Sequence, residues 1–106
     1  MKLITKEIEK RLAEHPLYSQ DGKGKKAEII CKFFLANLTF YVLEGQKTDN
    51  DYEFYGIIDN ANEYGSEYGY FNLSHLTPLR DRFGNTVERD LYFTAKTVGD
   101  CKEIRL

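Results

Sequence analysis

The stretch AEIICKFFLANLTFYVL, residues 27–43, consists of two apolar runs separated by Ala36-Asn37. Alternate side chains of an extended chain point to opposite faces, so the first run predicts a strand over 27–35 with one apolar face. That face carries Ile29, Cys31, Phe33 and Leu35. Two residues are enough for a tight turn, and we therefore expect a second strand at 38–43, antiparallel to the first.

The segment before this hairpin predicts a helix over 5–14. Thr5 is a suitable N-cap, acidic residues follow in the first turn, and Ile8 and Leu12 are spaced to form one apolar stripe. After the helix, Leu17-Tyr18 is expected to anchor its end against the fold.

Three further strands and a short helix are predicted in the second half of the chain. The strands are expected at 52–58, 67–73 and 91–95. A turn-rich connection is expected at 59–66. Ser74 or Thr77 is the candidate cap of the short helix, which should stop before Gly84. The tail from Val98 is expected to form one helical turn or to fray.

Together these elements predict an α+β fold. The connections between strands are too short for parallel crossovers, so we expect an antiparallel meander sheet of about five strands. The N-terminal helix should pack on one face of the sheet, and the short helix should precede the last strand. A chain of 106 residues is long enough for one such core and too short for two, so we expect a single domain over 1–106.

Composition and cysteine spacing narrow the class of protein. No apolar run approaches the ~18–20 residues of a membrane span, and residues 1–7 turn polar too early for a signal peptide. We therefore expect a cytoplasmic protein without a membrane partner. Cys31 and Cys101 follow no C-x-x-C spacing, and only two histidines accompany them. This pattern predicts two buried, reduced thiols and no metal or other cofactor.

Aromatic residues are concentrated in the segment EYGYF, residues 67–71. In a strand, Tyr68 and Tyr70 share one face, and Tyr52 and Tyr55 of the preceding strand are candidates to join them. This pattern is compatible with a half-buried sheet core and with a tyrosine-rich binding face.

Acidic residues are concentrated in the middle of the chain. Residues 44–69 contain seven acidic residues against Lys47, a net charge of −6, whereas residues 1–33 carry a net charge of +3. A continuous acidic stripe can imitate a phosphate backbone and occupy the basic groove of a DNA-binding enzyme. Loop carboxylates that serve only solubility are the simpler alternative.

The sequence Glu88-Arg89-Asp90 places a guanidinium between two carboxylates, just before an apolar run. A guanidinium pairs with carboxylates in a fixed fork, so this arrangement predicts an ion-pair cluster. If Glu44 and Glu67 converged on the same pocket, the cluster could instead serve acid–base chemistry. We assign no catalytic residue, because the chain shows no recognisable nucleophile with an adjacent base.

The basic loop at 21–26 suggests nucleic-acid binding as a further alternative function. Lys23, Lys25 and Lys26 could track phosphates while aromatic sheet residues stack on bases. The overall charge of −2 weakens nonspecific binding to nucleic acid, so this partner is disfavoured.

These features resemble those of domain of unknown function 2958, a family of small uncharacterised bacterial proteins. The resemblance extends over most of the chain and is most specific in 67–74 and 87–93. The other blocks that carry it are Leu3 and Thr5, Pro16-Leu17-Tyr18, Lys32-Phe33-Phe34, Tyr41 with Glu44, and Phe54-Tyr55-Gly56. Phe40 stands where a tryptophan is commoner. The resemblance implies carriage by mobile elements and a role against host defence, and it assigns no catalytic residue.

We therefore interpret the chain as a non-catalytic protein-binding module that modulates host-defence or DNA-processing proteins. We expect Arg89 to organise a tyrosine-rich, acidic face. The candidate binding residues are Tyr52, Tyr55, Glu67, Tyr68, Tyr70, Glu88, Arg89 and Asp90. A small enzyme or ligand-binding domain that uses the carboxylates and Arg89 is the first alternative, and a nucleic-acid-binding protein is the second.

Overall fold

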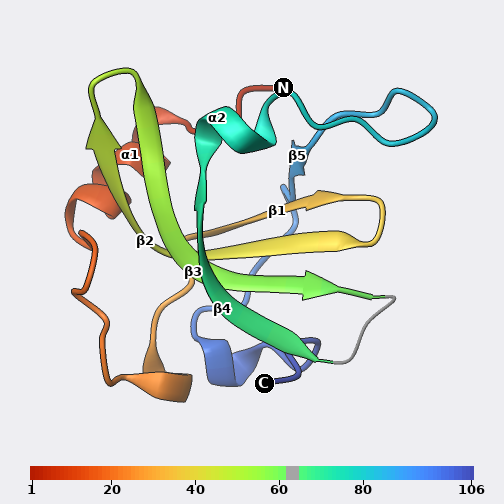
Figure 1. Cartoon of the computed structure of the whole chain (residues 1–106). Helices are drawn as coiled ribbons and strands as arrows, with labels where there is room; N and C mark the ends of the chain where they lie inside the picture. Colours follow the sequence, from red (N-terminus) through yellow and green to blue (C-terminus); the bar gives the residue numbers. More distant parts are fainter. Residues whose placement is uncertain (62–64) are drawn as a thin grey trace.

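The computed structural model, which describes residues 1–61 and 65–106, is built around one antiparallel sheet (Figure 1). The elements are α1 (Lys6–Ala13), η1 (Gly24–Lys26), β1 (Cys31–Leu35), β2 (Leu38–Thr48), β3 (Asp51–Asn60), β4 (Ser66–Asn72), α2 (Leu73–Leu76), β5 (Glu88–Arg89) and η2 (Val98–Asp100), where η marks a 3-10 turn. The strand order is β4-β3-β2-β1-β5. Strands β1 to β4 form the predicted meander, and β5 adds to the edge beside β1. The α+β class, the N-terminal helix and the short helix before the last strand are confirmed.

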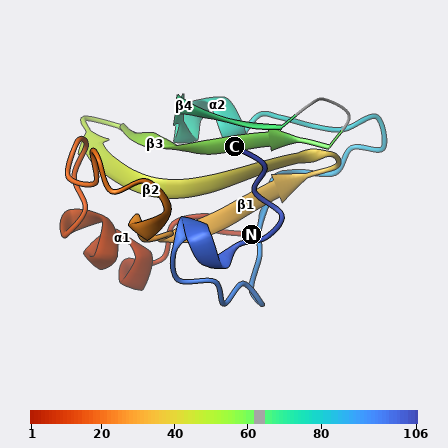
Figure 2. The ribbon, with the colours of Figure 1, turned by 90° about the horizontal axis from the view of Figure 1, so that it is seen from below.

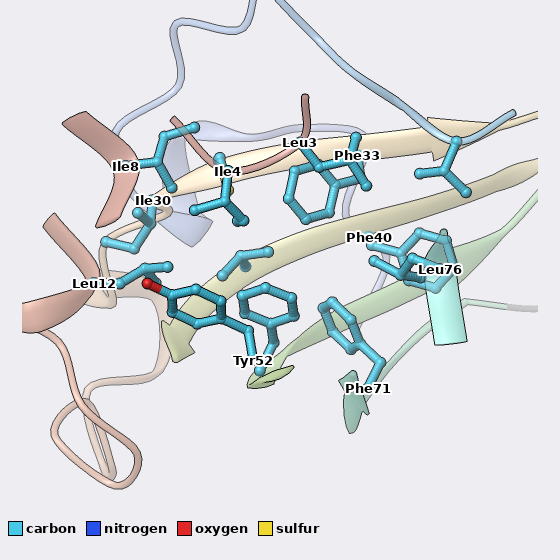
Figure 3. Packing of buried hydrophobic residues seen from close by; sticks show 14 of the residues in the cluster. Leu3, Ile4, Ile8, Leu12, Ile30, Phe33, Phe40, Tyr52, Phe71 and Leu76 are labelled. Atoms are coloured by element: carbon cyan, nitrogen blue, oxygen red, sulfur yellow. The ribbon is translucent and has the colours of Figure 1, made fainter. Parts of the chain in front are cut away.

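The main core lies on one side of the sheet, which we call the helix face because α1 and α2 cover it. Phe33 and Phe54 are fully buried there, with ring centroids 6.1 Å apart. Figure 3 shows Leu12 of α1 near Tyr52 and Leu76 of α2 near Phe40, within the same buried cluster. Burying such apolar surface stabilises the fold by about 25 cal/mol per Å².

The opposite side, which we call the tail face, has a smaller core beneath the C-terminal segment. Tyr41 and Ile57 of the sheet pack there with Val98 and Cys101 of the tail. Figure 1 shows η2 and the C-terminus below the strands, on the side away from α2, and in Figure 2 the blue C-terminal segment crosses in front of the strands. This cover reaches only part of the tail face.

Helix α1 forms where its cap and its apolar spacing predict it. The Thr5 side chain accepts a hydrogen bond from the Ile8 N–H at 3.2 Å, and Ile8 and Leu12 are buried. The predicted apolar stripe is therefore the face that packs on the sheet.

Strand β1 is shorter than the predicted strand 27–35. The Ile30 N–H donates to the Val42 carbonyl at 2.8 Å while Cys31 is also paired with Val42, so two residues lie opposite one. This local irregularity shifts the alternation, because an extra residue moves the preceding side chains to the other face. Ile29 consequently joins the tail-face core and Ile30 the helix-face core. Placing Ile29 on the face of Cys31 was wrong.

Strand β2 continues well beyond Leu43, where the sequence predicts its end. The register shifts between Val42 and Glu44, and the following residues keep pairing with β3 as far as Thr48 opposite Asp51. Ladder hydrogen bonds to a long partner strand therefore outweigh the polar composition of 44–48.

The last strand also differs from its prediction. Strand β5 is Glu88–Arg89 and pairs with β1, whereas no strand forms at 91–95. The Asp90 N–H donates to the Lys32 carbonyl, and the Asp90 side chain then accepts from the Tyr92 N–H. This turn leads the chain away from the sheet edge.

Helix α2 begins earlier than expected, directly after β4. Its N-cap position is Asn72, so neither Ser74 nor Thr77 is its N-cap, and it ends well before Gly84. The helical turn expected in the tail from Val98 is confirmed as η2. Of the predicted connection 59–66, residues 62–64 lie outside the described residues.

The Ser74 side chain instead fixes the start of β3, because its hydroxyl donates to Asp51 at 2.7 Å. This bond, with main-chain donors from Ser74 and Tyr52, lowers the pKa of Asp51 from 3.8 to about 2. A depressed pKa means that the folded chain binds this proton more weakly than the unfolded chain. The stabilisation is therefore present above pH 3.8 and is lost as the pH falls through about 2.

We predict that Ser74→Ala raises the pKa of Asp51 towards 3.8, although the main-chain donors keep it below that value. Titration of the carboxyl carbon by NMR measures this directly. Asp81, which Asn85 hydrogen-bonds in a separate turn, serves as the internal control and should not change. An unchanged Asp51 pKa in the variant would show that the Ser74 hydroxyl has no such role.

Candidate binding surface

Three tyrosines of β3 and β4 lie together on the tail face. Tyr55 is paired with Tyr70, and Tyr68 is two residues from Tyr70, so the three side chains leave the sheet on the same side. The Tyr55 and Tyr68 rings are nearly parallel with centroids 5.9 Å apart, and the Tyr55 and Tyr70 centroids are 4.9 Å apart. Tyr68 and Tyr70 are 43% and 52% exposed, so these rings form surface and not core.

Tyr18, from the segment after α1, completes the cluster. Its side chain is 65% exposed and is hydrogen-bonded to Tyr70. Sequence reasoning missed this residue and assigned it to docking the helix, because nothing local to Tyr18 indicates that the loop folds back to β4. We call Tyr18, Tyr55, Tyr68 and Tyr70 the tyrosine platform.

The loop that carries Tyr18 is held by the buried carboxylate of Glu44, on β2. Glu44 is 1% exposed, and its two oxygens accept the N–H groups of Tyr18 at 2.7 Å and Gln20 at 2.8 Å. The Gln20 amide in turn donates to the carbonyls of Leu43 and Glu28. These bonds let Tyr18 adopt a left-handed backbone with φ of 75°, which is strained for a residue with a side chain.

A hollow of about 340 Å³ opens between this loop and the tyrosine platform. It is lined by Gln20, Asp21, Gly22, Gly24, Ala27, Leu43, Glu44, Tyr55 and Tyr68. Two of these side chains are carboxylates and two are phenols, and none of the described residues that line it is basic. The charged side chains in the described lining of the hollow are therefore acidic.

Two phenols of the platform, those of Tyr55 and Tyr70, have a raised pKa. Burial, followed by the nearby Tyr68, Glu44 and Asp21 side chains, raises the pKa of Tyr55. Burial and the hydrogen bond to Tyr18 raise the pKa of Tyr70. Tyr55 and Tyr70 thus act as aromatic surface with a polar tip and not as acids or bases near neutral pH.

Tyr52, predicted as a candidate for the same surface, lies on the opposite face. It is 8% exposed, stacks on Phe54 with ring centroids 5.7 Å apart, and is hydrogen-bonded to Glu9 of α1. Figure 3 shows it among the core side chains with its hydroxyl end towards α1. The placement was wrong because residues two apart share a face, which joins Tyr52 to Phe54 and separates it from Tyr55.

Arg89 does not organise the tyrosine platform, because β4 and β5 occupy opposite edges of the sheet. With neighbouring strands about 4.8 Å apart, the two edges are roughly 19 Å apart. The Arg89 guanidinium donates to the main-chain carbonyls of Lys2 and Leu3, and Asp90 pairs with Lys32 at 3.5 Å. Arg89 therefore fixes the N-terminal segment to β5 instead of forming an ion-pair cluster.

The carboxylates proposed for acid–base chemistry do not converge either. Glu67 is paired with Ile58 and so points from the helix-face side of β4, whereas Glu88 is paired with Phe34 at the other edge. Glu44 lies on β2, where it holds the loop that carries Tyr18, and not at either edge of the sheet. The candidate carboxylates thus lie in three separate places: Glu44 on β2, Glu67 on β4, and Glu88 with Asp90 at the β5 edge.

The acidic residues of 44–69 do not all lie together in the structure. Asp51 and Glu53 share the tail face with Tyr55, while Asp59 is paired with Arg105 at 3.0 Å. Glu63 lies outside the described residues. Among the residues that the structure describes, the carboxylates of 44–69 therefore form no continuous stripe of the kind that imitates a phosphate backbone.

The three lysines considered for nucleic acid are exposed on the loop beside the hollow. Lys25 and Lys26 belong to η1, which packs against η2. Their side chains are not among those that line the hollow. The three lysines are thus exposed beside the hollow, whose described lining carries carboxylates and no basic side chain.

The two cysteines and the metal-ligating side chains of the described residues form no reactive site. Cys31 and Cys101 are buried and not disulfide-bonded, and burial raises the pKa of Cys31 to about 12. Burial and the bond to Glu103 raise the pKa of Cys101, so neither residue supplies a thiolate. Within 1–61 and 65–106, no three metal-ligating side chains lie close enough to share an ion.

Comparison with known proteins identifies one matching family. A family model described as "Protein of unknown function (DUF2958)" matches residues 3–98 of the 106. No curated protein and no solved structure matches the chain. In the described part of the chain, no helix has the length and apolar composition needed to cross a membrane.

Proposed function

Because the chain belongs to the DUF2958 family of proteins of unknown function, as its sequence resemblance predicted, we propose its function from its surface geometry. It is a non-catalytic module that binds a partner protein in the cytoplasm through the tyrosine platform. The observation that carries this proposal is the contact of four tyrosines, three of them more than 40% exposed, on one part of the sheet.

Exposed tyrosines in mutual contact are suited to binding. A tyrosine offers a large rigid ring and a polar tip at low cost in side-chain entropy, and such residues dominate the energetics of many interfaces. The platform is also preorganised, since Tyr55, Tyr68 and Tyr70 stand on paired strands and Glu44 fixes the loop that carries Tyr18. Little ordering is then needed when a partner docks.

The charges around the platform support a basic partner surface. Asp21 borders it from the loop, Glu53 is two residues from Tyr55 on the same face, and Glu44 lies beneath. Complementary charge steers association and excludes wrong partners. We propose that the partner is a DNA-processing or host-defence protein, whose nucleic-acid-binding surface supplies basic residues. This fits the mobile-element setting that the family resemblance implies.

Site-specific photocrosslinking in the native host tests the docking surface. A benzophenone amino acid replaces Tyr68 in one variant and Tyr92 in another, because Tyr92 is 90% exposed but follows β5 at the other edge. We expect position 68 to crosslink one protein through a basic segment and position 92 to give no such product. Equal products from both positions, or crosslinks from position 68 to nucleic acid alone, would contradict the proposal.

A further inference from the structure

We propose that the hollow beside the tyrosine platform binds the guanidinium group of an arginine side chain, supplied by the partner. This inference rests on the proposed function and names the chemistry by which the platform recognises its partner. It depends on three properties of the hollow: its charge, its aromatic wall and its size.

The charge of the hollow comes from Asp21 at its rim and Glu44 in its wall. Each Glu44 oxygen accepts one main-chain N–H group, and a carboxylate oxygen can accept a second bond. Burial strengthens the attraction between this carboxylate and an entering cation, because the local dielectric is lower than that of water. The described lining has no basic side chain that already neutralises the pair.

The aromatic wall is formed by Tyr55 and Tyr68. Their rings are stacked with planes only 6° apart, and both side chains line the hollow. A planar guanidinium can lie against such a ring while its edge donates to a carboxylate, which is why arginine suits this site better than lysine. Carboxylates together with aromatic rings are the combination that selects organic cations.

The size of the hollow limits its occupant. A volume of about 340 Å³ lies at the lower end of the range for small-molecule sites, which accommodates one side chain and not an extended peptide. The flanking tyrosines remain available for the residues around that arginine. The hollow therefore acts as an anchor pocket within a larger interface.

The probe that tests this site is N-acetyl-arginine methylamide, titrated into the ¹⁵N-labelled full chain. We expect saturable shifts of the amide signals of residues 20–24, with a dissociation constant on the order of 1 mM for so small a ligand. The isosteric N-acetyl-citrulline methylamide, which is neutral, should give no saturable shift. Equal responses to both probes, or none to either, would overturn the proposal.

A charge-matched pair of variants locates the site. Asp21→Asn removes the rim carboxylate and should weaken arginine binding about fivefold. Asp49→Asn removes the same charge from the exposed turn between β2 and β3 and should leave binding within twofold of the original. Equal weakening by the two variants would indicate general attraction to an acidic protein and would contradict a specific site.

The outcomes of this titration and of the crosslinking are separable. If arginine fails to bind while position 68 still crosslinks a protein, the pocket assignment falls and the proposed function stands. If arginine binds but position 68 crosslinks nothing, the cation site exists without the protein partner that we propose.

Discussion

Gly56→Ala is expected to prevent stable folding. A Cβ atom at position 56 would lie 1.9 Å from the carbonyl oxygen of Tyr41, on the neighbouring strand β2. Relieving that contact requires the two backbones to separate at the centre of the sheet, where the β2–β3 ladder is longest. We expect a loss of at least about 3 kcal/mol in the free energy of unfolding, measured by chemical denaturation.

Gly69 provides a matched control, because it is the cross-strand partner of Gly56 on β4. A Cβ atom there would meet only the Ile58 side chain, at 3.5 Å, which is an ordinary contact. Gly69→Ala should change the free energy of unfolding by less than about 1 kcal/mol, and lower chain entropy in the unfolded state favours a gain. Similar losses in both variants would refute the steric account.

Glu44→Gln has the second largest expected effect. The carbonyl oxygen of glutamine can still accept one of the two N–H groups from Tyr18 and Gln20, but its NH₂ group then faces the other. A buried N–H without a partner costs about 1–3 kcal/mol, and the remaining bond loses its charge assistance. We expect a total loss of about 2–3 kcal/mol in the free energy of unfolding.

The same variant should release the loop before the whole chain unfolds. Hydrogen exchange at the Tyr18 and Gln20 amides is expected to become faster than exchange in β3. Glu53→Gln is the control, since Glu53 is only half-buried on the same face and its replacement should change stability by less than about 0.5 kcal/mol. Unchanged protection of both amides in Glu44→Gln would show that another contact holds the loop.

Local signals in the sequence were sufficient for the fold class. Thr5 with its i, i+4 apolar pair predicts α1, and the run 27–43 predicts the β1–β2 hairpin. Element ends were less predictable, because they depend on pairing between strands. Polar residues after Leu43 remain in β2 only because β3 offers a partner, and the shift of Ile29 follows from two residues that face Val42.

The candidate surface was predictable only where strand alternation decides it. The shared face of Tyr68 and Tyr70 follows from their spacing, and Tyr55 joins through the β3–β4 register. Tyr18 reaches the platform through a loop whose course depends on Glu44, a contact across 26 residues. Arg89 looked central because of its charged neighbours, but only the strand order places it at the far edge.

The central claim is that the tyrosine platform is the docking surface for a protein. Its most direct test is the dissociation constant of the protein crosslinked from position 68, measured for the natural chain and two variants. The double change Tyr68→Ser with Tyr70→Ser should weaken binding by more than about 100-fold, because buried interface tyrosines contribute about 2 kcal/mol each. Tyr92→Ser should leave binding within about twofold. Undiminished binding by the correctly folded double variant would contradict the claim.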